Sequence, residues 1–332
     1  MGLIDGLKRT TEFSHAVAAG DFKAEYQPLS EEDVLGHALL KMRTELGERE
    51  RVLETKVKER TEEVVRQKEE VERQGRKVVE LYKNVTDSIR YAKRLQESIL
   101  PPDKRIKELL PESFVLYRPK DIVSGDFYWV EKVGDKVVFA AVDCTGHGVP
   151  GAFMSLVGHN GLNQAVKERG NTRPSDVLHD LDRMSYEALH KDRDQFMRDG
   201  MDMALCALDP KRMVLEYAGA NCPLYLMRGD DIQQYAPDKR PIGGADPGDK
   251  RFTDHRIELR KGDLIYIFSD GYADQFGGPN GKKFLQRRFR ELLISIRHET
   301  MERQKALLLE ALNKWRGAQE QVDDILVMGM RA

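Results

Sequence analysis

Cysteine is scarce in this sequence of 332 residues, which contains only Cys144, Cys206 and Cys222. Three thiols this scattered cannot build a disulfide framework or a CxxC metal site. We expect them to be free, buried thiols in a reducing cytoplasm. Long apolar runs are missing too, since no stretch approaches the ~20 residues that a membrane-spanning helix needs. No signal-peptide pattern opens the sequence. We therefore expect a cytoplasmic protein, or the cytoplasmic part of a membrane-anchored receptor.

The sequence also lacks an excess of either charge sign. It has 54 Lys and Arg against 56 Asp and Glu, which gives a formal net charge of −2. This balance argues against nucleic acid as a partner, because nucleic-acid-binding domains usually carry a basic excess. Charged residues make up 33% of the chain, above the roughly 25% of an average globular protein. Part of the chain is therefore expected to lie outside a compact core, and the length suggests about two domains.

Proline is absent between residues 47 and 98, where the charged residues concentrate. This segment reads as one long helix whose apolar residues recur every seven positions: Val57, Val64, Val71, Val78, Val85, Ala92 and Ile99. The companion positions three residues on include Arg60, Gln67 and Gln74. β-Branched residues at one seam position favour a parallel two-stranded coiled coil, and polar residues at the other lower its stability. We expect residues 47–102 to form a weak coiled coil that makes the protein a homodimer. A single solvated helix is the alternative.

Residues 1–46 contain two shorter amphipathic patterns joined by a polar connector. The segment 18–22 contains an AxGxF-like break, and Glu32 to Gly36 opens the second pattern with acidic residues, which favour a helix start. Met42 lies within that second pattern. These features resemble a HAMP signal-relay module, so we expect residues 1–46 to be such a module.

Pro101 and Pro102 end the long helix, because proline cannot continue its hydrogen-bond ladder. In residues 103–332, six runs have strand character: 114–117, 136–142, 204–208, 214–217, 224–227 and 264–268. Four stretches have helical character: 151–169, 174–191, 284–295 and 300–315. Turn signals at 133–136 and 228–231 predict hairpins. We expect an α+β domain, with an antiparallel β-sandwich flanked by helices.

Acidic residues stand at strand ends in four places of this domain. Asp126 follows Gly125, Asp143 ends one strand, Asp270 ends another and precedes a glycine, and Asp323 with Asp324 opens the last strand. A single such aspartate is usually a turn residue or a helix cap. Four together are better explained by oxygen ligands for hard divalent cations.

The stretches 123–129, 143–161, 269–272 and 322–327 resemble the motifs of metal-dependent protein phosphatases of the PPM superfamily, especially its SpoIIE-like bacterial branch. The stretch 91–101 also resembles the linker that precedes this domain in many sensor phosphatases. The resemblance implies that Asp143 bridges two Mn²⁺ or Mg²⁺ ions, with the Cys144 carbonyl as a further ligand. It places Asp126, Asp270 and Asp323 around the same ions, with Asp324 as the alternative to Asp323. His147 is a candidate general acid, or a brace for the helix that follows it.

Two places depart from the family pattern. Trp129 stands where many members have a second carboxylate, and residues 192–202 have no clear counterpart. That region is a candidate substrate flap in which Asp202 could be another metal ligand, or it is a solvated loop. Gly219–Asn221 and 242–244 are interpreted as structural turns.

We therefore expect a signal-regulated serine/threonine phosphatase whose substrate is a phosphorylated regulatory protein. The resemblance implies that this substrate could be a STAS-type anti-sigma-factor antagonist. The alternative is a non-catalytic phosphatase fold that acts as a docking module, but all four motif positions retain aspartate. A histidine kinase would need a phosphoacceptor histidine in the linker, and residues 48–100 contain none.

Overall fold

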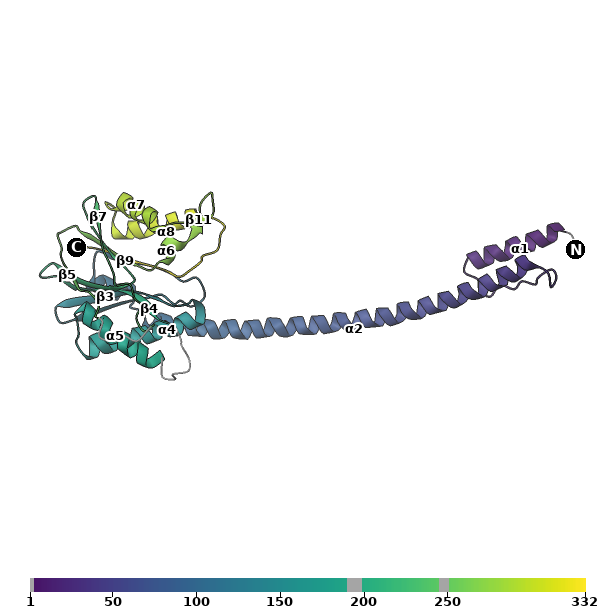
Figure 1. Cartoon of the computed structure of the whole chain (residues 1–332), viewed down its shortest axis with the longest axis horizontal. Helices are drawn as coiled ribbons and strands as arrows, with labels where there is room; N and C mark the ends of the chain where they lie inside the picture. Colours follow the sequence, from purple (N-terminus) through teal and green to yellow (C-terminus); the bar gives the residue numbers. More distant parts are fainter. Residues whose placement is uncertain (1–2, 190–198, 245–250) are drawn as a thin grey trace. The chain divides into compact units, whose positions relative to one another are not determined.

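The computed structural model describes residues 3–189, 199–244 and 251–332 (Figure 1). The chain divides into two compact units, Met1–Asn84 and Val85–Ala332. One long helix, α2 (Val34–Ile99), contributes residues to both units. No helix in the described ranges combines the length and the apolarity needed to cross a membrane.

The first unit begins with helix α1 (Leu3–Ala18), which buries Phe13 and Val17. The ring of Phe13 lies 4.9 Å from that of Tyr26 in the connector that follows α1. Asp33 anchors the end of this connector, because its carboxylate accepts hydrogen bonds from the Leu29 and Gly36 N–H groups, both at 2.9 Å. An acidic side chain that binds free N–H groups stabilises a helix start. The predicted helix start near residues 32–36 is therefore confirmed.

The long helix predicted over residues 47–98 is confirmed, but it begins earlier than expected. The second amphipathic pattern of residues 1–46 and the heptad segment form one continuous helix, α2. No proline interrupts the sequence between them, so the hydrogen-bond ladder continues through Gly47 and Gly75. The seam valines Val71 and Val78 are 67% and 63% exposed in the single chain.

The second unit contains two five-stranded antiparallel sheets. The first has the order β1-β12-β9-β6-β7, with β1 (Ser113–Arg118), β12 (Ile325–Arg331), β9 (Leu264–Phe268), β6 (Leu224–Arg228) and β7 (Asp231–Tyr235). The second has the order β2-β3-β4-β5-β8, with β2 (Phe127–Val133), β3 (Lys136–Cys144), β4 (Met201–Asp209), β5 (Val214–Ala220) and β8 (His255–Glu258). The short strands β10 (Phe276–Gly277) and β11 (Lys282–Lys283) form a separate pair.

Helices cover the outer face of each sheet (Figure 1). The second sheet is covered by α4 (Gly148–Leu162), the π-helical turn η1 (Asn163–Glu168) and α5 (Pro174–Leu189). The first sheet is covered by α7 (Gln286–Ile296) and α8 (Met301–Arg316). Two short helices, α3 (Asp103–Leu109) and α6 (Gly271–Asp274), complete the unit. The result is a four-layer arrangement of helices, sheet, sheet and helices.

Three apolar clusters fill the spaces between these layers. Each strand contributes to two of these spaces, because its side chains point alternately to its two faces. In β3, Phe139 and Ala141 face the other sheet, while Val138 and Ala140 face the helices. Successive side chains of a strand point to opposite faces. A strand that is covered on both faces therefore needs apolar residues at successive positions. This explains the continuous apolar runs in the sequences of β3 and β9.

The predicted α+β class and antiparallel sandwich are confirmed, as are the two hairpins, where Val133 pairs with Lys136 and Arg228 with Asp231. The six predicted strand runs all lie in strands, and 264–268 coincides with β9. The predicted helix over 151–169 starts earlier, at Gly148, and its last turns are π-helical. The end of the helix predicted over 174–191 lies outside the described residues. All three cysteines are free and buried, as predicted.

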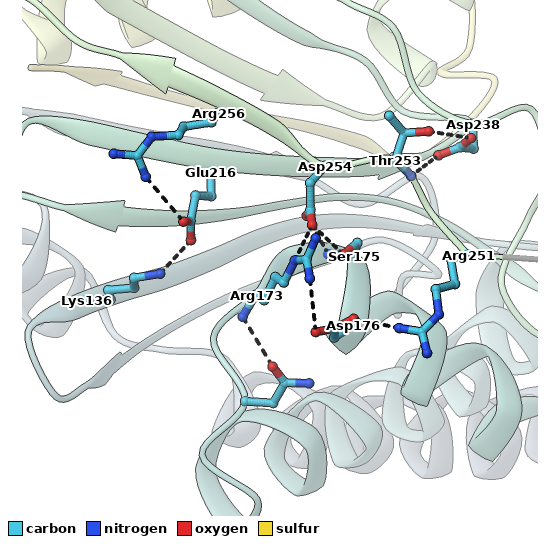
Figure 2. Close-up of polar contacts among 11 residues, drawn as sticks. Lys136, Arg173, Ser175, Asp176, Glu216, Asp238, Arg251, Thr253, Asp254 and Arg256 are labelled. Atoms are coloured by element: carbon cyan, nitrogen blue, oxygen red, sulfur yellow. Dashed lines mark hydrogen bonds and ion pairs between the residues drawn. The ribbon is translucent and has the colours of Figure 1, made fainter.

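Polar contacts attach α5 to the segment that precedes β8 (Figure 2). The Asp254 carboxylate accepts hydrogen bonds from the Ser175 N–H at 3.0 Å and from the Ser175 hydroxyl at 2.6 Å, in the first turn of α5. It also accepts one from Arg173 Nε at 2.5 Å. A carboxylate at this end of a helix complements the helix dipole. These contacts fix the first turn of α5 against the end of the second sheet where β8 begins.

Candidate active site

The predicted acidic residues come together at one edge of the two-sheet sandwich. Asp126 directly precedes β2 and Asp143 lies near the end of β3, and these strand ends are neighbours because Phe127 pairs with Val142. Asp270 follows β9 and Asp323 precedes β12, whose ends also meet, since Phe268 pairs with Val327. Asp143 lies an even number of residues from Phe139 and Ala141 along β3. Its side chain therefore points to the same side of the sheet as theirs, toward the other sheet.

Asp202 also belongs to this cluster, because it lies directly opposite Asp143 in the β3–β4 register. Asn221 holds its carboxylate through a hydrogen bond from Nδ2 to Oδ1 of 2.8 Å. Asn221 has a φ of +56°, a conformation that asparagine adopts more readily than most residues. The structure therefore brings Asp202 to the site. Most of the proposed flap over residues 192–202, namely residues 192–198, lies outside the described residues.

Burial and mutual repulsion raise the pKa values of these carboxyl groups. Burial is the main cause for Asp126 and Asp143, whose pKa values lie well above the usual range, and neighbouring aspartates add to it. The pKa of Asp270 rises to about 6 through partial desolvation and the charges of Asp274 and Asp323. Desolvation also raises the pKa values of Asp202 and Asp323. A group of carboxylates in such an environment is costly unless cations neutralise it.

Asp323 and Asp324 have different environments, which the sequence could not distinguish. Both oxygens of the buried Asp324 accept backbone hydrogen bonds of 2.7 Å, one from the Lys120 N–H and one from the Gly125 N–H. Asp323 is half-buried and its charge acts on Asp143 and Asp270. Asp324 thus holds the loop that carries Asp126, and the charges of both aspartates raise the pKa of Asp126. One oxygen of Asp323 accepts a hydrogen bond of 2.8 Å from the Asp324 N–H, and the other accepts none from the backbone of Lys120 or Gly125.

The donor set fits a hard divalent cation. Oδ2 of Asp126 is buried and has no hydrogen-bond partner, a condition that costs free energy unless another group satisfies the oxygen. The surrounding donors are carboxylate oxygens, which Mg²⁺ and Mn²⁺ prefer. Within the described ranges, no three His, Cys, Asp or Glu side chains already stand together as a closed metal-binding group. The site is an open set of oxygen donors.

The part of Cys144 that lies at this region is its backbone carbonyl oxygen and not its thiol. Burial raises the pKa of its thiol well above the usual range, so the sulfur stays protonated at neutral pH. Its carbonyl oxygen lies close to Gly125, where an added Cβ would come within 3.1 Å of it and within 2.4 Å of the Gly146 carbonyl. Gly125 therefore allows two backbone segments, each next to an acidic residue, to approach closely.

His147 precedes α4 as its N-cap residue, but its side chain forms no capping hydrogen bond. Its ring Nδ1 instead lies 2.7 Å from Oδ2 of Asp121, in the loop between β1 and β2. The ring is also close enough to lower the pKa of Asp323, against the larger effect of burial. The imidazole therefore stands beside the acidic cluster. The sequence did not indicate a role for Asp121.

Gln96 is a second residue whose contact with this site the sequence did not reveal. It lies near the end of α2 and is 5% exposed. Its side-chain amide donates to the Ser124 carbonyl at 2.6 Å and to the Ser155 hydroxyl at 2.9 Å, and accepts from the Ser124 N–H at 3.1 Å. Ser124 is two residues from Asp126. The end of α2 is thus hydrogen-bonded to the loop that carries one of the acidic residues, and no local sequence pattern signals such a contact.

A helix-covered pair of antiparallel sheets with acidic residues at one edge defines a PP2C-like phosphatase fold. The SiaA-PP2C domain of Pseudomonas aeruginosa superimposes with a TM-score of 0.69 and 31% identity, over 75% of this chain and 98% of that one. The PP2C phosphatase domain of SpoIIE from Bacillus subtilis, with a fragment of its regulatory domain, superimposes with a TM-score of 0.54. At 19% identity over 67% of this chain and 63% of that one, it supports the fold alone.

The profile of the Stage II sporulation protein E (SpoIIE) family matches residues 134–332, and the chain belongs to this family. Among named proteins, the phosphoserine phosphatase RsbU of Bacillus subtilis (strain 168) is 26% identical over 197 residues. That match covers 58% of this chain and 56% of RsbU, so the chain matches only about half of its relative's length.

Proposed function

We propose that this protein is a signal-regulated, metal-dependent phosphatase that removes phosphate from phosphoserine or phosphothreonine in a regulatory protein. The observation that carries the proposal is the cluster of desolvated, mutually repelling aspartates at the sheet edge of a SpoIIE-family domain. A docking module would have no need to retain this repulsion, which lowers the stability of the unliganded fold.

In this proposal Asp143 would help to hold two divalent cations, Mn²⁺ or Mg²⁺. Asp126, Asp270 and Asp323 provide further carboxylate oxygens, and the Cys144 carbonyl adds a neutral donor. Asp324 keeps its role in holding the loop of residues 120–125, because its two oxygens already accept backbone hydrogen bonds. Bound divalent cations supply positive charge that activates water and neutralises the phosphoryl oxygens.

The residues of the chain then orient the reactants and move the proton. The carboxylates determine where the phosphoryl group can lie, and the backbone approach at Gly125 keeps the two sides of the site together. His147 lies at the edge of the cluster and is the proposed general acid for the departing serine or threonine oxygen. No covalent phosphoenzyme is required, because water attacks phosphorus directly.

The proposed substrate is a small phosphorylated regulator, of which a STAS-type anti-sigma-factor antagonist is an example. The name of the relative RsbU, a phosphoserine phosphatase, supports phosphoserine as the group that is hydrolysed. We further propose that residues 1–46 are a HAMP-like module, that 47–102 pair as a coiled coil in a homodimer, and that 103–332 carry catalysis. The exposed seam valines of α2 support the pairing.

The test is phosphate release from a phosphoserine protein or peptide by the full chain, with Mn²⁺ and with a chelator. We expect release only with the metal, and little release by an Asp143→Asn variant. The matched control is Asp135→Asn, which changes an exposed aspartate paired with Lys211 at 2.8 Å. Binding of phosphoproteins without release, in the presence of Mn²⁺, would favour the docking module instead.

A further inference from the structure

Asp121 and His147 form a hydrogen-bonded pair beside the acidic cluster. The distance from Oδ2 of Asp121 to Nδ1 of His147 is 2.7 Å, and the two residues are 26 positions apart in the sequence. Both side chains are about half-exposed, with 46% and 50% of their surface accessible. Contacts between exposed side chains contribute little to stability as a rule, so removing this pair should hardly affect the free energy of unfolding.

The backbone conformation of residues 146–148 directs the ring of His147 toward Asp121. Gly146 and Gly148 have φ values of +84° and +66°, which glycine adopts without strain. His147 between them is extended, with φ −116° and ψ 173°. A Cβ at Gly148 would lie 3.3 Å from Oδ2 of Asp121, so the missing side chain leaves room for the carboxylate. The ring is directed to Asp121 and does not cap α4.

The position of Asp121 is fixed from both sides of its loop. The preceding residue, Lys120, and the later residue Gly125 both donate backbone hydrogen bonds of 2.7 Å to the carboxylate of Asp324. Asp324 is buried, so water does not compete for these hydrogen bonds. The residue that holds the Asp126 loop therefore also holds the backbone on both sides of Asp121.

We propose that Asp121 is a positioning residue that orients His147 for proton donation to the leaving group. The carboxylate accepts the Nδ1 hydrogen of the ring, which leaves Nε2 to carry the proton that is transferred. A carboxylate in this place fixes the tautomer and stabilises the charged ring. This inference rests on the proposed phosphatase function and names a residue that the family resemblance did not assign.

The proton balance of the step is simple. The oxygen of a water molecule forms a bond to phosphorus while the bond between phosphorus and the seryl or threonyl oxygen breaks. The departing oxygen takes the proton from Nε2 of His147 and leaves as an alcohol. The attacking water releases a proton to solvent, and the neutral ring regains one from solvent. The hydrogen bond between Nδ1 of His147 and Asp121 is kept throughout.

A comparison of leaving groups separates this role from a structural one. An alkoxide needs a proton as it leaves, whereas p-nitrophenolate is a stable anion and leaves without one. With the full chain and saturating Mn²⁺, Asp121→Asn should lower kcat for a phosphoserine peptide by about 10- to 100-fold. This loss is smaller than the ~10²–10⁴-fold that a general acid contributes, because the acid itself remains. Its kcat for p-nitrophenyl phosphate should stay close to that of the parent. KM for the peptide should not change, because the contact acts in the transition state.

A double-mutant cycle shows whether Asp121 acts through His147. His147→Asn should show the same substrate dependence, and the double variant should be no slower on the peptide than His147→Asn alone. Asp135→Asn serves as the exposed-aspartate control and should leave both substrates unaffected. The rise in Tm on adding Mn²⁺ should be the same in all variants, which shows that metal binding is intact.

Three results would overturn the inference: equal losses on both substrates in Asp121→Asn, unchanged peptide turnover in that variant, or multiplicative losses in the double variant. A parent protein that hydrolyses neither substrate with Mn²⁺ would overturn the proposed function itself, and the inference with it. The parent's activity therefore distinguishes failure of the proposed function from failure of the Asp121 assignment.

Discussion

At the residue scale, the β3–β4 register places two carboxylates, Asp143 and Asp202, directly across from each other. Like charges in such a cross-strand pair are destabilising. The hydrogen bond that holds Asp202 comes from the neutral amide of Asn221, which cannot neutralise the charge. A bound cation would relieve this repulsion, and this is the physical argument for the metal-dependent site that we propose.

Asp143→Asn should abolish phosphatase activity while the fold remains intact. The variant keeps the shape of the side chain but loses the charge proposed to be shared by both ions. We expect kcat/KM for a phosphoserine peptide to fall by at least about 100-fold, as when a principal electrostatic group is lost. Circular dichroism should show an unchanged fold. Near-parent turnover of this variant with added Mn²⁺ would show that the two-metal assignment is wrong.

Asp270→Asn should make the metal-free protein more stable at neutral pH. The pKa of Asp270 is raised to about 6 in the fold, from 3.8. Between about pH 4 and pH 6 the folded protein holds a proton that the unfolded chain has lost, so this group's contribution to stability falls as pH rises. Because Asp270 is exposed enough for water to screen its charge, we expect a gain of no more than about 1 kcal/mol.

The measurement is the Tm of parent and Asp270→Asn, both with a chelator, at pH 4 and at pH 7. The Tm of the variant should exceed that of the parent at pH 7. The difference should be smaller at pH 4, where the Asp270 carboxyl group of the folded parent is mostly protonated. A gain of the same size at both pH values would contradict the electrostatic explanation.

At the element scale, α2 is a 66-residue helix with a seam of valines that the single chain leaves exposed. Most of the stability of a helix in a protein comes from packing of its apolar face rather than from helix propensity. A seven-residue repeat of valines supplies such a face for a second helix. A second copy of the chain, paired in parallel, is the partner that we propose.

Replacing Val71 and Val78 with Lys should shift the protein from dimer to monomer. Unpaired charges at seam positions of a coiled coil would be buried at a cost of several kcal/mol. Light scattering over a concentration series measures the change. The control carries Lys at Val65 and Val79, one position beyond the seam, where 49% and 69% of the side chains are exposed. A dimer that persists in the seam variant would assign the contact to another part of the chain.

At the scale of the whole molecule, α2 contributes to both compact units, and its last turns belong to the unit Val85–Ala332. Gln96 there makes three hydrogen bonds, to Ser124 and Ser155, and Leu100 joins the core between the second sheet and its helices. A change in the geometry of the helix end would therefore alter the Asp126 loop. We propose that the coiled coil regulates catalysis through this connection.

Replacing Arg60, Gln67 and Gln74 with Leu should fix catalytic activity at a high or a low level. These polar residues weaken one seam of the helix pair, so two arrangements can differ by only a few kcal/mol. Apolar residues would stabilise one of them. The measurement is kcat/KM on one phosphopeptide with saturating Mn²⁺, for the triple variant, the parent and residues 85–332 alone.

The matched control places Leu at Glu62, Glu69 and Arg76, which adds the same apolar surface outside the seam. It should behave like the parent. Equal catalytic efficiency of the seam variant, the parent and residues 85–332 would mean that the coiled coil is a passive tether.

The sequence by itself determined the local elements of this protein and the candidates for its site. The apolar run 264–268 and the turn signals at 133–136 and 228–231 predicted a strand and two hairpins correctly, because backbone preference and alternation act over a few residues. The four acidic motifs identified the family for the same reason, since each motif is a short, contiguous stretch.

Only the tertiary structure decided which side chains meet. Asp202 faces Asp143 through strand register, Asp324 binds the Lys120–Gly125 loop about 200 positions away, and His147 contacts Asp121 across 26 positions. Register and loop approach depend on how two sheets and their helices pack, and periodicity carries no information about such pairs. Asp323 and Asp324 are adjacent and chemically identical, so the sequence cannot indicate which of them is the candidate metal ligand. The two residues differ only in the hydrogen bonds and burial that the fold gives them.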